Sequence, residues 1–112
     1  MLPPAARLRR RQEFTDVVRR GRRSSRGPLT LHLDLLDGPA TPQVGFVIGK
    51  VVGPAVVRNR LRRRLRHLLR SRLVGLPVGS RLVVRARPGA GDLDSAALGA
   101  LLDAALPRLV AP

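Results

Sequence analysis

Several residue types are missing from this sequence of 112 residues. It contains no cysteine, which excludes disulfides, thiolate metal sites and a cysteine nucleophile. No stretch approaches the roughly 18 apolar residues of a membrane-spanning helix, and residues 1–11 lack the apolar core of a signal peptide. We therefore expect a soluble protein of the reducing cytoplasm.

Negative charge is scarce as well. Seven acidic residues stand against 22 basic ones, which gives a formal net charge of +15. So strong a positive field around one small domain predicts a polyanionic partner. Hydrophobic residues make up 44% of the chain, so the charges should lie on a folded body with one core. All basic residues except Lys50 are arginine, which suits phosphate recognition, although a GC-rich genome would produce the same bias.

The spacing of the apolar residues predicts three helices and three strands. The helices are expected over residues 12–20, 54–73 and 92–106, and the strands over residues 29–35, 44–49 and 81–86. The basic run at residues 21–27 is interpreted as a loop. The whole chain, residues 1–112, should form one α+β domain, an α/β sandwich, with residues 1–6 flexible and residues 108–112 frayed.

Turn and cap residues indicate how these elements are joined. The turn at residues 37–42 is rich in glycine and proline, so a hairpin between the first two strands is the economical pairing. Asp92 or Asp94 should cap the last helix, and Pro107 should end or kink it.

No protein-borne active site is visible in the sequence. It lacks a metal-binding histidine pair, a glycine-rich nucleotide loop and a serine nucleophile motif. His32 and His67 lie on different predicted elements and the acids are scattered, so spacing shows no acid–base pair. For each histidine, a surface position or a satisfied contact is favoured over catalysis.

The predicted helix over residues 54–73 carries the strongest functional signal. One stripe is apolar, and the other faces are nearly all arginine, at Arg58, Arg60, Arg62, Arg63, Arg64, Arg66, Arg70 and Arg72. Like charges three or four residues apart repel each other, and no acid occurs between Asp37 and Asp92 to balance them. A polyanion would relieve this repulsion, with salt-dependent binding. Composition alone does not separate RNA from DNA.

Asn59 is the neutral exception on this helix. Its amide both donates and accepts hydrogen bonds, so it could read a base, bind a sugar hydroxyl or hold neighbouring arginines in place. A local side-chain bond within the helix is an equally good interpretation.

One continuous motif joins the strand at residues 44–49 to the arginine helix. It runs from Val44-Gly45-Phe46 through Gly49-Lys50 and Gly53 to an Arg-Asn-Arg core and a basic pair, at Arg58, Asn59, Arg60, Arg62 and Arg63. This motif closely resembles the signature of the bacterial ribonuclease P protein subunit. Residues 7–21 also resemble that family's opening helix, and residues 83–88 resemble its late strand and turn.

The resemblance implies a specific fold. It implies an α-β-β-β-α-β-α order, a ribosomal protein S5 domain 2-like arrangement with a small sheet. The arginine-rich helix would lie in a left-handed βαβ crossover, against the usual right-handed preference. A short strand is also implied near residues 22–26, where the residue pattern indicates a loop.

The resemblance further implies a division of labour within a holoenzyme. The RNA subunit would catalyse hydrolytic removal of the 5′ leader from precursor tRNA, with Mg²⁺ held mainly by the RNA and no cofactor bound tightly by the protein. The protein should be inactive alone, monomeric in a 1:1 complex with the RNA, and should raise substrate and Mg²⁺ affinity. The residues matching the family's contacts to the RNA subunit are Arg58, Asn59, Arg60, Arg62, Arg63 and Arg66.

The family's leader-binding cleft lies between the opening helix and the sheet. The matching positions are Phe14, Val18, His32 and Lys50. Relatives often carry aromatic residues where Val18 and His32 stand here, so base stacking should contribute less and arginines more. For Phe14, core packing is as good an interpretation as leader contact.

Two other functions stay open. A structural RNA-binding module of the ribosomal-protein type also combines a basic surface with a small core. A nonspecific DNA-binding protein would bind duplex DNA as tightly as RNA at matched salt. The ordered motif of strand, Lys50, Gly53 and Arg-Asn-Arg favours the ribonuclease P subunit over both.

Overall fold

The computed structural model describes residues 2, 4–35 and 41–111, so residues 37–40 of the predicted turn lie outside it. All six elements predicted from apolar spacing are present, with small shifts at their ends. The full order, in which η denotes a short 3-10 helix, is η1 (Pro4–Ala6), α1 (Arg11–Arg20), β1 (Arg22–Arg26), β2 (Leu29–Leu35), β3 (Gln43–Ile48), η2 (Lys50–Val52), α2 (Ala55–Arg72), η3 (Leu73–Gly75), β4 (Ser80–Ala86), η4 (Ala90–Asp92) and α3 (Ser95–Val110).

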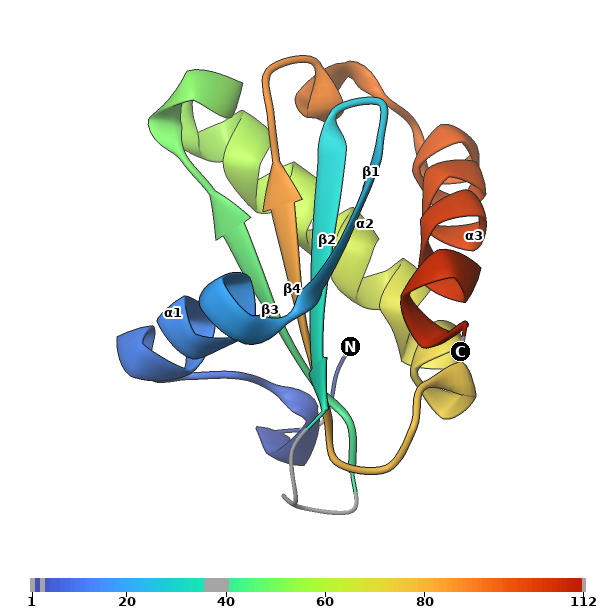
Figure 1. Ribbon diagram of the computed structural model, residues 1–112. Helices are drawn as coiled ribbons and strands as arrows, with labels where there is room; N and C mark the ends of the chain where they lie inside the picture. Colours follow the sequence, from blue (N-terminus) through green and yellow to red (C-terminus); the bar gives the residue numbers. More distant parts are fainter. Residues whose placement is uncertain (1, 3, 36–40, 112) are drawn as a thin grey trace.

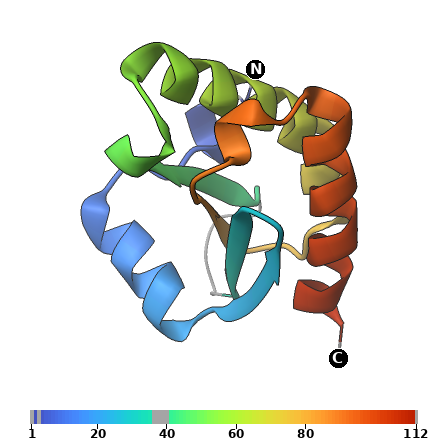
Figure 2. The same ribbon diagram turned by 90° about the horizontal axis from the view of Figure 1, so that it is seen from above.

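The elements form three layers (Figures 1 and 2). A four-stranded sheet lies in the middle, with α1 on one face and α2 and α3 on the other. The main core lies between the sheet and the last two helices, and the leucines central to it include Leu29, Leu31, Leu33, Leu61, Leu65, Leu69, Leu98 and Leu102. A smaller cluster of Leu8, Val17 and Val83 lies beneath α1. The apolar stripe predicted for the arginine helix is therefore the side that packs on the sheet.

The sheet has the strand order β1-β2-β4-β3. β2 pairs antiparallel with β1 and β4, whereas β3 pairs parallel with β4. The predicted hairpin between residues 29–35 and 44–49 was therefore wrong, because β4 lies between those strands. β4 buries Leu82 and Val84 in the main core and Val83 against α1. A strand that is apolar on both faces is most stable in the centre of a sheet.

The connection from β3 through α2 to β4 is left-handed. In the view of Figure 1, β4 lies to the right of β3, both strands point upward, and α2 passes behind the sheet. Figure 2 confirms that α1 and α2 lie on opposite faces. This is the uncommon crossover hand that the family resemblance implied.

β1 shows that a strand can form without an apolar pattern. Arg22–Arg26 pairs with β2 along its whole length, so the interpretation of this run as a loop was wrong and the strand implied by the resemblance is present. β1 lies at the edge of the sheet and is held there by main-chain pairing with β2, which does not require an apolar side-chain pattern. Gly27, in the left-handed region at φ 54°, turns the chain into β2.

The last helix is longer than predicted. Asp94 caps it by accepting a hydrogen bond from the Ala97 N–H at 2.8 Å, so the second of the two proposed caps is confirmed. α3 continues through Pro107 to Val110, so of the two effects predicted for Pro107, an end or a kink, the helix end was wrong. The buried side chains of Leu106 and Leu109 hold this final turn on the protein.

Both ends of the described chain are attached to the body. Leu2 and Ala6 are each 1% exposed and lie in the main core, within the segment predicted to be flexible. At the other end, the Arg22 guanidinium donates hydrogen bonds to the carbonyls of Leu109, at 3.1 Å, and Ala111. Cations at a helix C-terminus are stabilising because the last carbonyls are unpaired. Residues 108–110 are therefore helical, whereas the sequence predicts fraying there.

Gly21 joins α1 to β1 at a point where two backbone segments meet. A Cβ atom there would lie 2.5 Å from the Val17 carbonyl oxygen and 2.8 Å from that of Leu33. Because neither is a movable side-chain end, we expect Gly21→Ala to lower the free energy of unfolding by about 1–3 kcal/mol. Urea unfolding measures the loss. Gly75→Ala is the control, since its Cβ would meet nothing within 4 Å, and equal losses would show that Gly21 is not sterically required.

Candidate RNA-binding surfaces

The arginine helix α2 presents the residues predicted to contact RNA on its accessible sides. Asn59, Arg60 and Arg63 are exposed, and Arg58, Arg62 and Arg66 are half-buried. The opposite side of the helix is fixed by Leu61, Leu65 and Leu69, all nearly inaccessible. The core therefore holds a rigid row of guanidinium groups facing outward.

Hydrogen bonds within the protein fix several of these side chains. Arg58 Nε donates to the Gly53 carbonyl at 3.1 Å, and Arg64 Nη1 donates to the Leu93 carbonyl at 2.7 Å. Asn59 Oδ1 accepts from Arg62 Nη1 at 3.2 Å, so the amide makes the local bond that the sequence left open. Its NH₂ group keeps its donors for another partner. Pre-positioned arginines lose less side-chain entropy when they bind phosphate.

Acidic residues do not neutralise this row. Within the described part of the chain, Arg72 is the single α2 residue in an ion pair, with Asp103 of α3 at 2.8 Å. That side-chain hydrogen bond lowers the pKa of Asp103 and raises the pKa of Arg72. The arginines nearer the start of α2 lack such a partner. These arginines therefore repel one another, and a bound polyanion would remove that repulsion.

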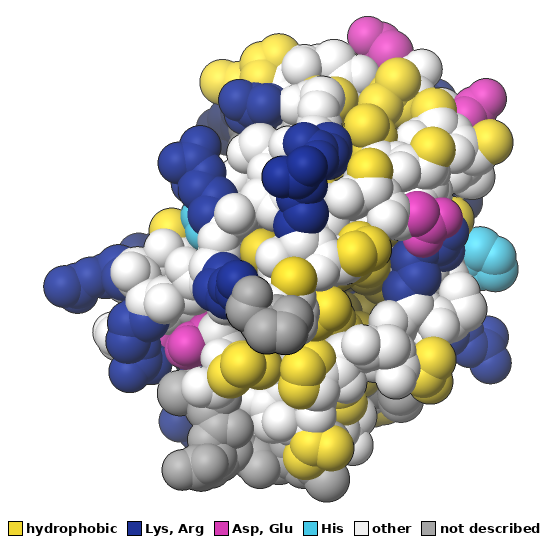
Figure 3. All heavy atoms as spheres, turned by 45° about the vertical axis from the view of Figure 1, so that its right-hand side comes forward, with side chains coloured by type: hydrophobic (Ala, Val, Ile, Leu, Met, Phe, Trp, Pro, Cys, Tyr) yellow, Lys and Arg dark blue, Asp and Glu magenta, His cyan; other side chains and the backbone are white. Residues whose placement is uncertain are grey.

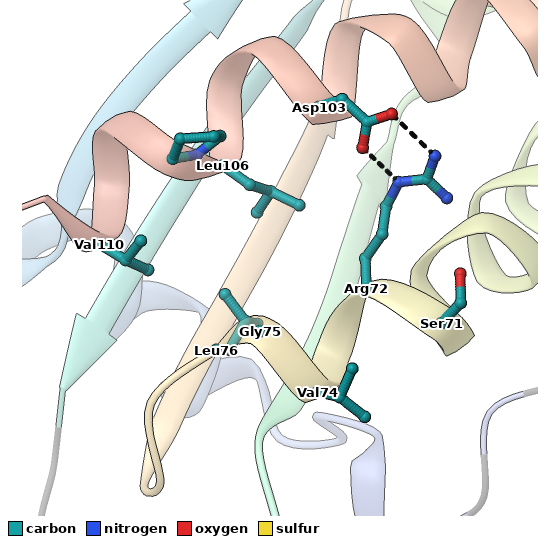
Figure 4. Close-up of a pocket in the computed structure, with 9 residues that line it drawn as sticks. Ser71, Arg72, Val74, Gly75, Leu76, Asp103, Leu106 and Val110 are labelled. Atoms are coloured by element: carbon teal, nitrogen blue, oxygen red, sulfur yellow. Dashed lines mark hydrogen bonds and ion pairs between the residues drawn. The ribbon is translucent and has the colours of Figure 1, made fainter.

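The end of α2 differs in character from its start. A pocket of about 370 Å³ lies between α2, η3 and α3, with walls formed largely by Val74, Leu76, Leu106 and Val110 (Figure 4). The space-filling view of this side shows a broad apolar patch with basic side chains on either side of it (Figure 3). Because Asp103 neutralises the Arg72 charge at its rim, this pocket lacks the features of a phosphate site.

On the other face of the sheet, charged side chains fasten α1 to the strands. Arg20 Nη2 lies 3.6 Å from Oδ2 of the buried Asp34 on β2, and Arg81 Nη2 on β4 lies 3.7 Å from Glu13 Oε2. Glu13 Oε1 also accepts from the Arg10 N–H at 2.9 Å, which is the main cause of the lowered pKa of Glu13. These contacts at both ends of α1 set its position over the sheet.

Two of the predicted leader-contacting residues, Phe14 and Val18, belong to α1 itself and lie on its side that packs on the sheet. Phe14 and Val18 are half-buried and pack on the cluster of Leu8, Val17 and Val83. The Phe14 ring occupies the space above Gly45, where any Cβ atom would overlap it. Phe14 therefore contributes to packing, as one of the two interpretations has it, and is half-buried; its contact with the leader stays a prediction.

His32 lies in the sheet surface next to α1. It is 4% exposed, and neither ring nitrogen has a hydrogen-bond partner among the described residues. Burial is the main cause that lowers the pKa of His32, and the nearby charges of Arg85 and Arg23 lower it further. The ring is therefore neutral at pH 7, with one donor and one acceptor nitrogen that are both buried.

A depression continues along the sheet from His32 and away from α1; we call it the sheet hollow. It measures about 280 Å³ and is lined by Arg23, Thr30, Val47, Gly49, Val51, Arg85, Ala86 and Arg87. Thr30 lies two residues from His32 on the same face of β2, and its strand partner is Arg85. Lys50 is exposed and lies between Gly49 and Val51 of the rim.

Sequence reasoning missed Arg23 and Arg85 as members of this site. Arg85 could have been found, because the alternation of β4 places it on the same face as Val83. Arg23 could not, since its strand has no apolar alternation to reveal which face it occupies.

Residues 2–110 match the family model described as Ribonuclease P. The chain belongs to the ribonuclease P protein family. A "Ribonuclease P protein component" of Streptomyces griseus is 53% identical over 118 residues, which cover 98% of this chain and 96% of the relative. One from Thermobifida fusca is 49% identical, covering 100% of this chain and 81% of the relative.

Solved structures of ribonuclease P proteins share the fold. The RNase P protein of Staphylococcus aureus superposes with a TM-score of 0.83 at 18% identity, covering 92% of this chain and 94% of that one. The RNase P protein of Thermotoga maritima, solved in complex with 1-(4-fluorophenyl)-2-thiourea, gives a TM-score of 0.77 at 24% identity, with 91% and 95% covered. The predicted α+β fold and element order are confirmed.

Membership of the ribonuclease P family connects the chain with RNA binding and tRNA processing. Over residues 2, 4–35 and 41–111, no helix has the length and apolar character needed to cross a membrane. The same residues include no group of three or more histidine and acidic side chains placed to hold a metal ion.

Proposed function

We propose that this ribonuclease P protein binds the catalytic RNA of the holoenzyme through α2. The single observation that carries this is the row of arginines that the core holds outward without acidic partners. Guanidinium groups match phosphate geometry, and each phosphate that they neutralise releases condensed counterions. The six contact residues are Arg58, Asn59, Arg60, Arg62, Arg63 and Arg66.

The second proposed contact is with the single-stranded 5′ leader of precursor tRNA. It would follow the sheet from Phe14, Val18 and His32 into the sheet hollow beside Lys50. Three arginines line the hollow, Arg23, Arg85 and Arg87, and the neutral His32 ring lies in the sheet surface two residues from Thr30. A single strand has both exposed base edges and phosphates, so it can use polar and charged groups together.

α1 and α2 cover opposite faces of the sheet (Figure 2), and the sheet hollow lies on the α1 side, so the two proposed contacts would let one small protein hold both RNAs at once. Catalysis is assigned to the RNA subunit, which would hold the Mg²⁺ whose chemistry is activation of the attacking water. Positive charge from the protein lowers the repulsion between leader and RNA subunit, which raises the affinity for substrate and for Mg²⁺. We propose a 1:1 complex in which the protein alone is inactive.

The test is cleavage of 5′-labelled precursor tRNA by ribonuclease P RNA at low Mg²⁺, with and without this protein. We expect release of the intact leader to depend on the protein, because its charge replaces part of the missing Mg²⁺. Protein without RNA should give no product. Tight RNA binding with no stimulation of cleavage would contradict the proposal and would favour a structural RNA-binding module.

A further inference from the structure

A second basic depression lies at the β3 edge of the sheet; we call it the edge pocket. It measures about 350 Å³ and is separate from the sheet hollow, with which it shares no lining residue. Its walls come from the segment before α1, from β3 and from α2, and they consist of Arg7, Leu8, Arg9, Val44, Gly45, Phe46 and Arg66.

The N-terminal segment builds this pocket by pairing with the edge strand. The Leu8 N–H donates to the Val44 carbonyl at 2.9 Å, and Arg7 forms a parallel bridge with Val44. Arg7 is held further by bonds from Nε and Nη2 to the Leu2 carbonyl, at 3.0 and 2.7 Å. Since Leu2 is itself buried in the core, Arg7 is fixed at both backbone and side chain. The pocket is therefore pre-formed on this side.

Phe46 supplies an aromatic wall. It pairs with Val84 of β4, packs partly on the main core and is one of the residues that line the pocket. The chain has two phenylalanines and no tyrosine or tryptophan. Phe46 therefore lies on the edge strand, close to arginines, at a position where core packing alone does not require an aromatic side chain.

The electrostatics of the pocket favour an anion. No acidic residue lines it, and three arginines from two segments meet there, Arg7 and Arg9 from the segment before α1 and Arg66 from α2. Burial lowers the pKa of Arg66, and the like charges of Arg7 and Arg62 lower it further. An anion between these groups would remove the repulsion that the fold otherwise maintains.

We infer that the edge pocket binds one nucleotide of an RNA strand, with its phosphate between Arg7, Arg9 and Arg66 and its base against Phe46. The inference rests on the proposed function, since it assigns a further contact of the same holoenzyme. The nucleotide comes from one of two sources, the RNA subunit bound along α2 or the precursor tRNA. Both present the same chemistry, a phosphate next to an aromatic base.

Two substitutions test the pocket without removing its structural contacts. Arg9→Ala removes an exposed side chain that makes no hydrogen bond or ion pair within the described part of the chain. Phe46→Leu keeps an apolar group on the core and removes the stacking surface. Arg108→Ala, exposed near the end of α3, is the control with the same loss of charge. Thermal unfolding followed by circular dichroism selects a temperature at which all variants are folded.

Binding is measured to the ribonuclease P RNA alone, and then by the holoenzyme to precursor tRNA and to leaderless tRNA. We expect each pocket variant to weaken either binding to the RNA subunit or binding of the holoenzyme to precursor tRNA, by about tenfold. That loss is typical of one base–aromatic stack or one or two phosphate contacts. Arg9→Ala should also reduce the slope of log affinity against log salt by about one. A loss in RNA-subunit binding assigns the nucleotide to that RNA, and a loss confined to precursor tRNA assigns it to the leader.

The inference is overturned if both pocket variants behave like Arg108→Ala in every assay. Arg60→Ala on α2 is measured in parallel to separate this result from a failure of the proposed function. If Arg60→Ala weakens RNA binding and the pocket variants do not, the α2 contact stands and the edge pocket does not. If Arg60→Ala also binds RNA as tightly as Arg108→Ala does, both the α2 contact and the edge-pocket contact are contradicted.

Discussion

Replacing Arg60 and Arg63 together by alanine is expected to weaken binding to ribonuclease P RNA by about 30-fold at about 0.15 M salt. Both residues are exposed on α2 and lack acidic partners among the described residues, so each can contact a phosphate. One such contact adds about 0.9 to the slope of log affinity against log salt. The slope should therefore fall by about two, and the loss should grow as salt is lowered. Filter binding across a salt series measures both quantities.

A matched control separates position from charge. Arg19→Ala with Arg108→Ala removes the same two charges from exposed positions on α1 and α3. If this control weakens binding as much as the α2 pair, the RNA responds to net charge and α2 is not a defined interface. Asn59→Ala adds a finer comparison, because it releases the Arg62 guanidinium from its 3.2 Å bond without changing the charge.

The sequence identifies α2 well because this one helix contains both the regularly spaced leucines that mark its buried side and the arginines that mark its accessible sides. Leu61, Leu65 and Leu69 fix the buried side by their spacing, and the same spacing then determines which arginines face outward. Side-chain direction in a helix follows from local geometry, so no knowledge of the rest of the fold is needed. Spacing therefore identifies the arginine-bearing sides of α2 before the structure, whereas the six contact residues on it came from the family resemblance, and their role in RNA binding stays a prediction.

Strand pairing could not be predicted in the same way. The alternation along residues 29–35 and 44–49 reveals two strands but carries no information about which strand lies beside which. The short intervening turn favoured a hairpin, whereas the fold inserts β4 between the two strands. β4 lies in the centre because it buries apolar side chains on both faces, Leu82 and Val84 on one and Val83 on the other. Val83 is buried because α1 covers the second face of the sheet.

The sheet hollow illustrates how this limit affects the site. Arg23, Thr30 and Arg85 come from three strands and meet because of the register of β1, β2 and β4. A site assembled across strands is invisible until the pairing is known. The family resemblance supplied Phe14, Val18, His32 and Lys50 by position. The structure adds Arg23 and Arg85, which the resemblance did not include.

Reversing the charge of Arg85 is expected to weaken holoenzyme binding to precursor tRNA by about 30-fold at about 0.15 M salt, because one phosphate contact is lost and one repulsion is added. Arg85 is exposed and lines the sheet hollow opposite Thr30. The substitution is Arg85→Glu, and the substrates are precursor tRNA with a leader of several nucleotides and leaderless tRNA. Affinity for leaderless tRNA should be unchanged, since the hollow would contact the leader alone. Arg108→Glu is the control for charge reversal.

The same variant has a second readout at His32. Burial is the main reason that the pKa of His32 is low, and the positive charge of Arg85 lowers it further. Replacing that charge by a carboxylate favours protonation of the ring, so the pKa of His32 should rise in an NMR titration of the free protein. A raised pKa together with unchanged leader affinity would show that the hollow was altered as designed and that the leader does not bind there. A raised pKa with a loss specific to precursor tRNA would place the leader against β4 at Arg85, next to the buried ring of His32.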